Sequence, residues 1–251
     1  MPFNANRRTR PLLARQLDLP PPFRPIALRE AGDAFAHALQ VAAEEGAGAL
    51  VHVGRFDLAE FAVVLEPDEP LRTARRAIYA GTAALADALA AHAPPEKPIR
   101  IDWPDAICVD RGLVGGTRLA GPAGSDEETV PPRLVFGAMI RIANVGVNEI
   151  GLAPLSTALE DEGFAFDDRA LVESFARHFM TAIDIWQHDG FGAIAQSYLA
   201  RLTPESGVGR DIDDNGDLLL RHPANTAVER RRLDPALLRP SWLDPATGGP
   251  R

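Results

Sequence analysis

Apolar residues recur along this chain with two different periods, and the change of period predicts its secondary structure. Stripes at helical spacing predict helices over about 33–45, 73–91, 168–189 and 191–202. Short alternating or continuous apolar runs predict strands that begin near residues 49, 61, 99, 107, 113 and 134. Because strand signals and helical stripes interrupt each other, we predict an α/β (α+β) fold in which a mixed β-sheet is backed by helices.

The same pattern divides the chain into three segments. Residues 1–25 contain Pro20-Pro21-Pro22 and are predicted to form an extended N-terminal arm. Residues 26–204 form the main domain, in which Thr157-Ala158-Leu159-Glu160 predicts a short capped helix ending at Gly163. Residues 205–251 are predicted to form a small C-terminal β-hairpin domain and a tail, since Asn215-Gly216 is a hairpin turn signal.

The stretch from residue 98 to residue 119 organises the predicted sheet. Arg100 and Asp102 alternate with two isoleucines, so the two charged side chains share one face of a strand. Trp103-Pro104 ends that strand, because proline has no N–H for the ladder. Cys108 lies in the next buried run, and Gly115-Gly116 allow a backbone or a ligand to approach closely. Spacing alone favours an ordinary β-meander with a proline corner.

Composition excludes several classes of function. The net charge of -9 argues against a general nucleic-acid binder, and no apolar run is long enough to span a membrane. The single cysteine excludes an internal disulfide and fits a reducing, cytoplasmic location. The six histidines lack metal-ligand spacing, so no metal site is predicted. Lys97 is the only lysine, so any mechanism that needs a lysine has one candidate.

The central stretch resembles the core of the biotin/lipoate protein ligase family. The family's Lys-Trp-Pro-Asn-Asp and Leu-Ala-Gly patterns align with residues 102–106 and 113–115, and the resemblance spans roughly residues 26–220. Gly54-Arg55 resembles a shortened form of the family's Gly/Arg-rich loop. Gly137 retains one glycine of a Gly-x-Gly-x-Asn strand, in which Arg141 takes the place of the asparagine.

The resemblance implies a set of site residues for chemistry on a biotin-, lipoate- or octanoate-like acid and a carrier protein. The catalytic positions are Asp102, Arg100 and Cys108. The ligand-binding positions are Gly54, Arg55, Trp103, Gly115, Gly116, Gly137 and Arg141. We predict one pocket between the central meander and the strand at 134–142, and this pocket requires Asp102 and Arg141 on the same face of the sheet.

Three hypotheses follow, and the sequence leaves them open. The first is an acyl ligase that uses ATP with biotin or lipoate. In the second, Cys108 attacks a thioester, although its apolar neighbours are typical of a buried thiol. The third is a non-catalytic binder of an organic acid. Asp102 replaces the family's catalytic lysine and Gly112 replaces a second lysine, so ATP binding is predicted to be weak.

Overall fold

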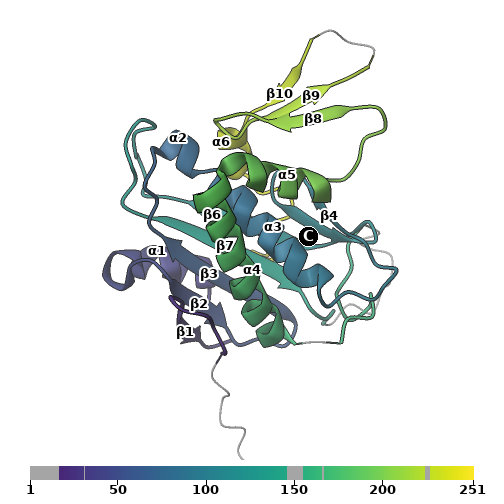
Figure 1. Cartoon of the computed structure of the whole chain (residues 1–251). Helices are drawn as coiled ribbons and strands as arrows, with labels where there is room; N and C mark the ends of the chain where they lie inside the picture. Colours follow the sequence, from purple (N-terminus) through teal and green to yellow (C-terminus); the bar gives the residue numbers. More distant parts are fainter. Residues whose placement is uncertain (1–16, 31, 146–154, 166, 224–226) are drawn as a thin grey trace, which may run out of the picture.

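The computed structural model describes residues 17–30, 32–145, 155–165, 167–223 and 227–251. These residues form a seven-stranded mixed sheet with the strand order β1-β2-β3-β7-β6-β5-β4, and a three-stranded antiparallel sheet with the order β10-β9-β8 (Figure 1). The strands of the large sheet are β1 Arg24–Leu28, β2 Ala49–Val53, β3 Leu58–Leu65, β4 Ile99–Asp102, β5 Ala106–Val109, β6 Gly112–Ala120 and β7 Leu134–Arg141. The small sheet contains β8 Gly209–Ile212, β9 Leu218–Arg221 and β10 Glu229–Arg231. The helices are α1 Ala34–Glu45, α2 Leu71–Ala74, α3 Ala77–Ala90, α4 Asp168–Asp189, α5 Phe191–Arg201 and α6 Leu233–Leu237.

The predicted fold class is confirmed, with three differences in detail. The helix predicted over 73–91 is two helices, because the backbone turns at Arg75 and Arg76. The capped helix predicted at 157–163 is wrong: the chain makes consecutive turns there, and the Thr157 hydroxyl donates to the Glu162 carboxylate at 2.8 Å. The predicted N-terminal arm already contains the start of β1, which pairs in parallel with β2, while residues 1–16 lie outside the described part of the chain.

Helices cover the two faces of the large sheet unequally. Figure 1 shows α3 and α4 running across one face, and their apolar residues form the main core with Phe61 and Phe136 of the sheet. On the other face α1 contributes three buried alanines, which pack against β2, β3 and β7. Asp33 caps α1 by accepting from the Ala36 N–H at 2.8 Å. Because α1 reaches only the β1 side of the sheet, the remainder of this face is left to other segments.

The C-terminal strap, which we define as residues 241–251, crosses that remaining face. Trp242 is completely buried and packs with Leu58, Ala106 and Met139 from three strands. Leu243 forms a β-bridge with Pro250, so the strap folds back on itself as a closed loop. The predicted tail is therefore part of the packed structure over its last eleven residues.

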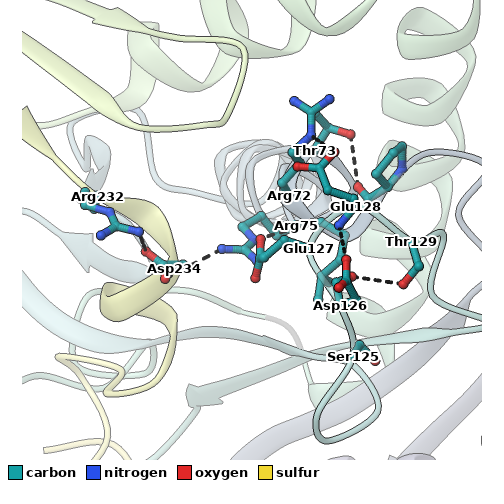
Figure 2. A network of polar contacts seen from close by, with 12 residues as sticks. Arg72, Thr73, Arg75, Ser125, Asp126, Glu127, Glu128, Thr129, Arg232 and Asp234 are labelled. Carbon is teal, nitrogen blue, oxygen red and sulfur yellow. Dashed lines mark hydrogen bonds and ion pairs between the residues drawn. The ribbon is translucent and has the colours of Figure 1, made fainter.

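An ion-pair network ties the loop at 121–132 to the rest of the protein (Figure 2). Three consecutive acidic residues, at 126–128, lie in this loop. In the structure its acidic residues pair with α2 and the turn after it: Arg72 of α2 contacts Glu128 at 3.1 Å, and Arg75 of the turn contacts Glu127. Arg75 also reaches Asp234 of α6 at 3.9 Å, so the loop, α2 and the C-terminal region share one set of partners.

Among the described helices, none combines the length and the apolar character needed to cross a lipid bilayer.

Candidate functional site

A cavity of about 900 Å³ opens on the sheet face that carries α1 and the strap. Its walls come from the β2–β3 connection, the ends of β3 and β7, and the segment Thr247 to Pro250 of the strap. This volume lies in the range of small-molecule sites in proteins. Of the residues predicted for the site, Arg55 and Arg141 line the cavity.

Arg141 is the cation at the base of this cavity. Its guanidinium donates to the backbone carbonyls of Pro250 at 2.7 Å and of Arg251 at 3.1 Å, and to the hydroxyl of Ser156. The Pro250 carbonyl and the Ser156 hydroxyl are neutral acceptors, and Arg141 has no ion pair with a carboxylate side chain among the described residues. Burial lowers the pKa of the guanidinium, and no neighbouring carboxylate opposes that shift. A partly buried cation with no carboxylate side chain beside it is suited to bind an anionic group.

Arg55 is neutralised within its own loop. Its Nε and Nη2 donate to the two oxygens of Asp57 at 3.0 and 2.7 Å. This bidentate pair raises the pKa of Arg55 and lowers the pKa of Asp57. Gly54 precedes the pair in an exposed position with no atoms near the place of a side chain. The shortened loop therefore places at the cavity an arginine whose charge is already neutralised by Asp57.

Acidic groups also line the cavity. Glu60 is 4% exposed, and its carboxylate accepts from the Ala34 N–H at the start of α1 at 2.7 Å. Burial raises the pKa of Glu60. Asp33 and Asp161 also line the cavity. Together with Asp57, four carboxylates line the cavity against two arginines. Asp57 pairs with Arg55, and Asp33 pairs at 3.2 Å with Arg118, which stands outside the lining. The lining therefore offers a highly charged anion no excess of positive charge.

Asp102 lies on the same face of the sheet as Arg141, as the predicted site requires. The strand register runs from Asp102 through Ala106 and Gly116 to Met139, which stands two residues before Arg141. Trp242 covers the middle of this row, where it packs on Ala106 and Met139. Asp102 and Arg100 consequently lie outside the cavity lining, on the far side of the indole. The structure does not bring all the predicted residues into one pocket, because the strap divides that face.

Asp102 has its own partners beyond the strap. The Thr203 hydroxyl donates to one carboxylate oxygen at 2.6 Å, and the Cys108 thiol lies 3.5 Å from the other. Desolvation and the neighbouring Asp102 raise the pKa of Cys108 to about 12. A thiol that stays protonated at neutral pH is a poor nucleophile. The geometry thus argues against the thioester hypothesis for Cys108.

This environment makes the reactivity of Cys108 measurable. At pH 8 a thiol with a pKa of about 12 is ionised roughly a thousandfold less than an ordinary one. We expect iodoacetamide to alkylate the native protein at least 100-fold more slowly than the protein unfolded in guanidinium, which serves as the control. Cys108→Ser should leave ligand binding unchanged. Equal alkylation rates in the native and unfolded protein would restore Cys108 as a candidate nucleophile.

The glycines predicted to admit a ligand admit parts of the protein instead. A side chain at Gly115, where φ is +148°, would begin 2.0 Å from the backbone oxygen of Met139. At Gly116 it would begin 2.3 Å from the indole of Trp242, and at Gly137 it would begin 2.4 Å from the ring of Phe35. These three glycines therefore allow β7, the strap and α1, respectively, to pack closely against the sheet.

Trp103 points to the opposite side of the sheet. Its indole N–H donates to the hydroxyl of Tyr79 on α3 at 3.0 Å, and its ring packs against the main core. The Pro104 carbonyl accepts from the Tyr198 hydroxyl of α5 at 3.0 Å. The Trp-Pro corner thus fastens the helices to the sheet, and it lies away from the cavity lining.

Sequence reasoning missed Glu60 and the strap. The signal for Glu60 was present, because period two within β3 places this acid on the face of Leu58 and Ala62. The strap has no comparable signal, since Thr247 to Pro250 are small residues without periodicity. Only the fold places them at the cavity.

Comparisons with known proteins agree with this architecture. A sequence model described as the Biotin/lipoate A/B protein ligase family matches residues 19–200. A curated biotin--[acetyl-CoA-carboxylase] ligase from Paracoccus denitrificans is 28% identical over 184 residues, which cover 66% of this chain and 75% of that protein.

Solved structures show the same similarity. A biotin protein ligase-like protein of unknown function from a Silicibacter species superimposes with a TM-score of 0.77 at 26% identity, covering 89% of this chain and all of that one. Biotin protein ligase from Aquifex aeolicus superimposes with a TM-score of 0.63 at 14% identity, over 84% of this chain and all of that one. At that identity the second similarity supports the fold alone.

Proposed function

The chain belongs to the biotin/lipoate A/B protein ligase family, and from this premise we propose that its cavity binds a biotin-, lipoate- or octanoate-like organic acid. Arg141 holds the carboxylate of this acid, and the apolar body of the acid lies along Leu58 and Met139. The observation that supports the proposal is the guanidinium of Arg141, which lines the cavity and has no carboxylate side chain as a partner among the described residues.

The distribution of charge supports binding of a monocarboxylate over binding of a nucleotide. A triphosphate brings several negative charges, and the cavity meets them with Asp33, Glu60, Asp161 and the neutralised Arg55–Asp57 pair. Asp102, where the family has its catalytic lysine, adds no cation. Two like charges about 4 Å apart repel by roughly 4 kcal/mol at an effective dielectric of 20. Our first candidate function is therefore binding of an organic acid without tight binding of ATP.

A second candidate is acyl transfer to a biotinyl or lipoyl carrier domain. The relationship to a Paracoccus denitrificans protein named as a biotin--[acetyl-CoA-carboxylase] ligase favours it. In this candidate the acid is activated in the same cavity and delivered to a lysine of the carrier. Arg141, Arg118 and, beyond the strap, Arg100 are cations on this sheet face that this chemistry could use in place of the missing lysines.

Calorimetry with biotin, lipoate, octanoate and Mg-ATP separates the two candidates. We expect one of the acids to bind with a Kd in the micromolar range and Mg-ATP to bind with a Kd above about 1 mM, equivalent to less than about 4 kcal/mol. The reason is the excess of carboxylates in the lining. Tight ATP binding, or acyl-adenylate formed from ATP and an acid, would favour the ligase candidate instead.

The variant Asp102→Lys tests the position of any nucleotide. If a nucleotide occupies the pose implied by the family resemblance, the restored lysine should strengthen its binding at least tenfold. If Trp242 separates residue 102 from the ligand, affinity for both acid and ATP should remain within about twofold of the unmodified protein. Asp110→Lys, an exposed change in the adjacent turn, is the matched control for added charge.

A further inference from the structure

Four residues at the adjoining ends of β3 and β7 form a square in the lining of the cavity. In the strand register Leu58 stands opposite Arg141 and Glu60 stands opposite Met139, so the four side chains share one face of the sheet. All four line the cavity. The two charged residues occupy one diagonal of this square, where Cα atoms are about 7–8 Å apart. The two apolar residues occupy the other diagonal.

The two charged side chains of the square have no partner of opposite charge. Among the described side chains, no ion pair joins Glu60 to Arg141 or to any other cation. Glu60 accepts through Oε1 from the Ala34 N–H at 2.7 Å. Arg141 donates to the Ser156 hydroxyl and to the Pro250 carbonyl. A carboxylate and a guanidinium therefore face the same cavity from neighbouring strands without neutralising each other.

The neighbouring arginines leave the charge of Glu60 uncompensated. Burial raises the pKa of Glu60, and the positive charges of Arg118 and Arg55 offset this effect only in part. Arg118 pairs with Asp33 at 3.2 Å, and Arg55 pairs with Asp57 at 2.7 Å. A ligand that brings its own cation to Glu60 would supply the ion-pair partner that this buried carboxylate lacks.

We propose that the ligand of this cavity is an α-amino acid with an apolar side chain, whose carboxylate binds Arg141 and whose ammonium binds Glu60. The inference rests on the proposed function, because it keeps the carboxylate at Arg141 and adds a second charged group to the acid. In an α-amino acid the nitrogen and the carboxylate carbon are about 2.5 Å apart. Charge-assisted hydrogen bonds of about 2.8 Å extend this head group towards both protein side chains. The apolar part of the ligand then lies along Leu58 and Met139.

Other classes of ligand satisfy only one of the two charged groups. A plain monocarboxylate at Arg141 places a second negative charge near Glu60, and the two negative charges repel each other. An amine without a carboxylate pairs with Glu60 and leaves Arg141 without an anion. A zwitterion neutralises both groups at once and adds no net charge to the cavity.

Calorimetry with four eight-carbon ligands tests this inference. The ligands are octanoate, 2-aminooctanoate, 2-hydroxyoctanoate and 2-aminooctanamide. We expect 2-aminooctanoate to bind at least tenfold more tightly than octanoate or 2-hydroxyoctanoate, because it alone adds a positive charge beside the carboxylate. It should also bind at least tenfold more tightly than 2-aminooctanamide, which offers Arg141 no anion.

Glu60→Gln separates the charge of this residue from its contact with α1. The glutamine amide retains an oxygen that can accept from the Ala34 N–H. In this variant 2-aminooctanoate should lose its advantage over octanoate, and octanoate should bind at least as tightly as it binds the unmodified protein. Glu44→Gln, an exposed change on α1, is the matched control and should keep the tenfold advantage.

The outcomes distinguish the inference from the function on which it rests. If neither these ligands nor biotin and lipoate bind the unmodified protein, the proposed function fails and the inference fails with it. If octanoate binds and 2-aminooctanoate binds no more tightly, the zwitterion inference is overturned while the proposed function stands. An advantage of 2-aminooctanoate that persists in Glu60→Gln would overturn the inference as well, because the ammonium would then bind another group. Should Glu60→Gln not fold, the comparison of octanoate with 2-aminooctanoate in the unmodified protein decides.

Discussion

Replacing Arg141 by glutamine is expected to abolish the preference of this protein for a carboxylic acid over the corresponding amide. We expect the unmodified protein to bind biotin or lipoate about 100-fold more tightly than biotinamide or lipoamide, because the charge-assisted interaction of a carboxylate with a guanidinium contributes about 2–3 kcal/mol more than a neutral contact. In Arg141→Gln the acid and the amide should bind with similar, weak affinity. Calorimetry with each acid and amide pair measures the effect.

Glutamine is the informative substitution because Arg141 also holds the strap. The guanidinium donates to the carbonyls of Pro250 and Arg251, and a glutamine amide retains N–H donors for such carbonyls. Loss of the charge is therefore separated from loss of the strap. The thermal midpoint should fall by only a few degrees, and amide binding should stay near the unmodified level.

Arg100→Gln supplies the matched control. Arg100 shares the sheet face of Arg141 but lies outside the cavity lining, so its loss should leave the preference for the acid intact. An acid preference that survives in Arg141→Gln, or disappears in Arg100→Gln, would place the carboxylate elsewhere on this face.

Local patterns predict the elements of this fold well. Period two within β4 places Arg100 and Asp102 together on one face. Helical stripes likewise predict α4 and α5. These inferences succeed because each depends on residues within one strand or helix.

The division of the sheet face could not be predicted in the same way. It depends on Trp242 contacting Gly116 and Met139, residues more than a hundred positions away. The two glycines at 115 and 116 correctly indicate a close approach, but a glycine does not specify whether a ligand or the chain itself approaches. The family resemblance also gives no help there, because it ends near residue 220.

Charge compensation is the second feature beyond the reach of the sequence. Arg55 and Arg141 are equivalent as residue types, yet Asp57 neutralises one while the other has no carboxylate side chain as a partner among the described residues. Asp57 stands two positions from Arg55, and that pair is visible in the sequence. The partners of Arg141 come from residues 156, 250 and 251, which only the folded chain assembles.

The second large expected effect is on the stability of the folded protein, and it involves Asp105, which follows the Trp-Pro corner. Its side chain is 0% exposed and one of its carboxylate oxygens, Oδ2, has no hydrogen-bond partner, while the Ser241 hydroxyl lies 3.4 Å from the other oxygen. Burial raises the pKa of Asp105 to about 7. The family resemblance places an asparagine at this position. An asparagine has the same shape and stays neutral, so it avoids the cost of a buried charge.

Asp105→Asn is therefore expected to stabilise the protein in alkaline but not in acidic solution. In the unfolded chain this carboxyl ionises near pH 3.8, whereas in the folded protein it ionises near pH 7. Below pH 3.8 both states are protonated and the aspartate costs nothing. As the pH rises from 3.8 to 7 the folded state loses stability relative to the unfolded state, and above pH 7 the loss is complete at about 4 kcal/mol. Urea unfolding of both proteins at pH 4.5 and pH 8 measures this difference.

We expect the stability advantage of Asp105→Asn over the unmodified protein to be at least 2 kcal/mol larger at pH 8 than at pH 4.5, since relaxation around an ionised carboxylate reduces the full cost. Asp184→Asn, an exposed change on α4, controls for the general loss of one negative charge and should shift stability by less than about 0.5 kcal/mol at either pH.

Because Ser241 of the strap contacts Asp105, ionisation of Asp105 should also loosen the strap. Hydrogen exchange at the Trp242 indole N–H should then accelerate between pH 6 and pH 8 by more than the intrinsic increase with pH. An advantage that is equal at the two pH values would show that Asp105 is already ionised in the folded protein at pH 4.5, and that the buried carboxyl has a partner other than Ser241.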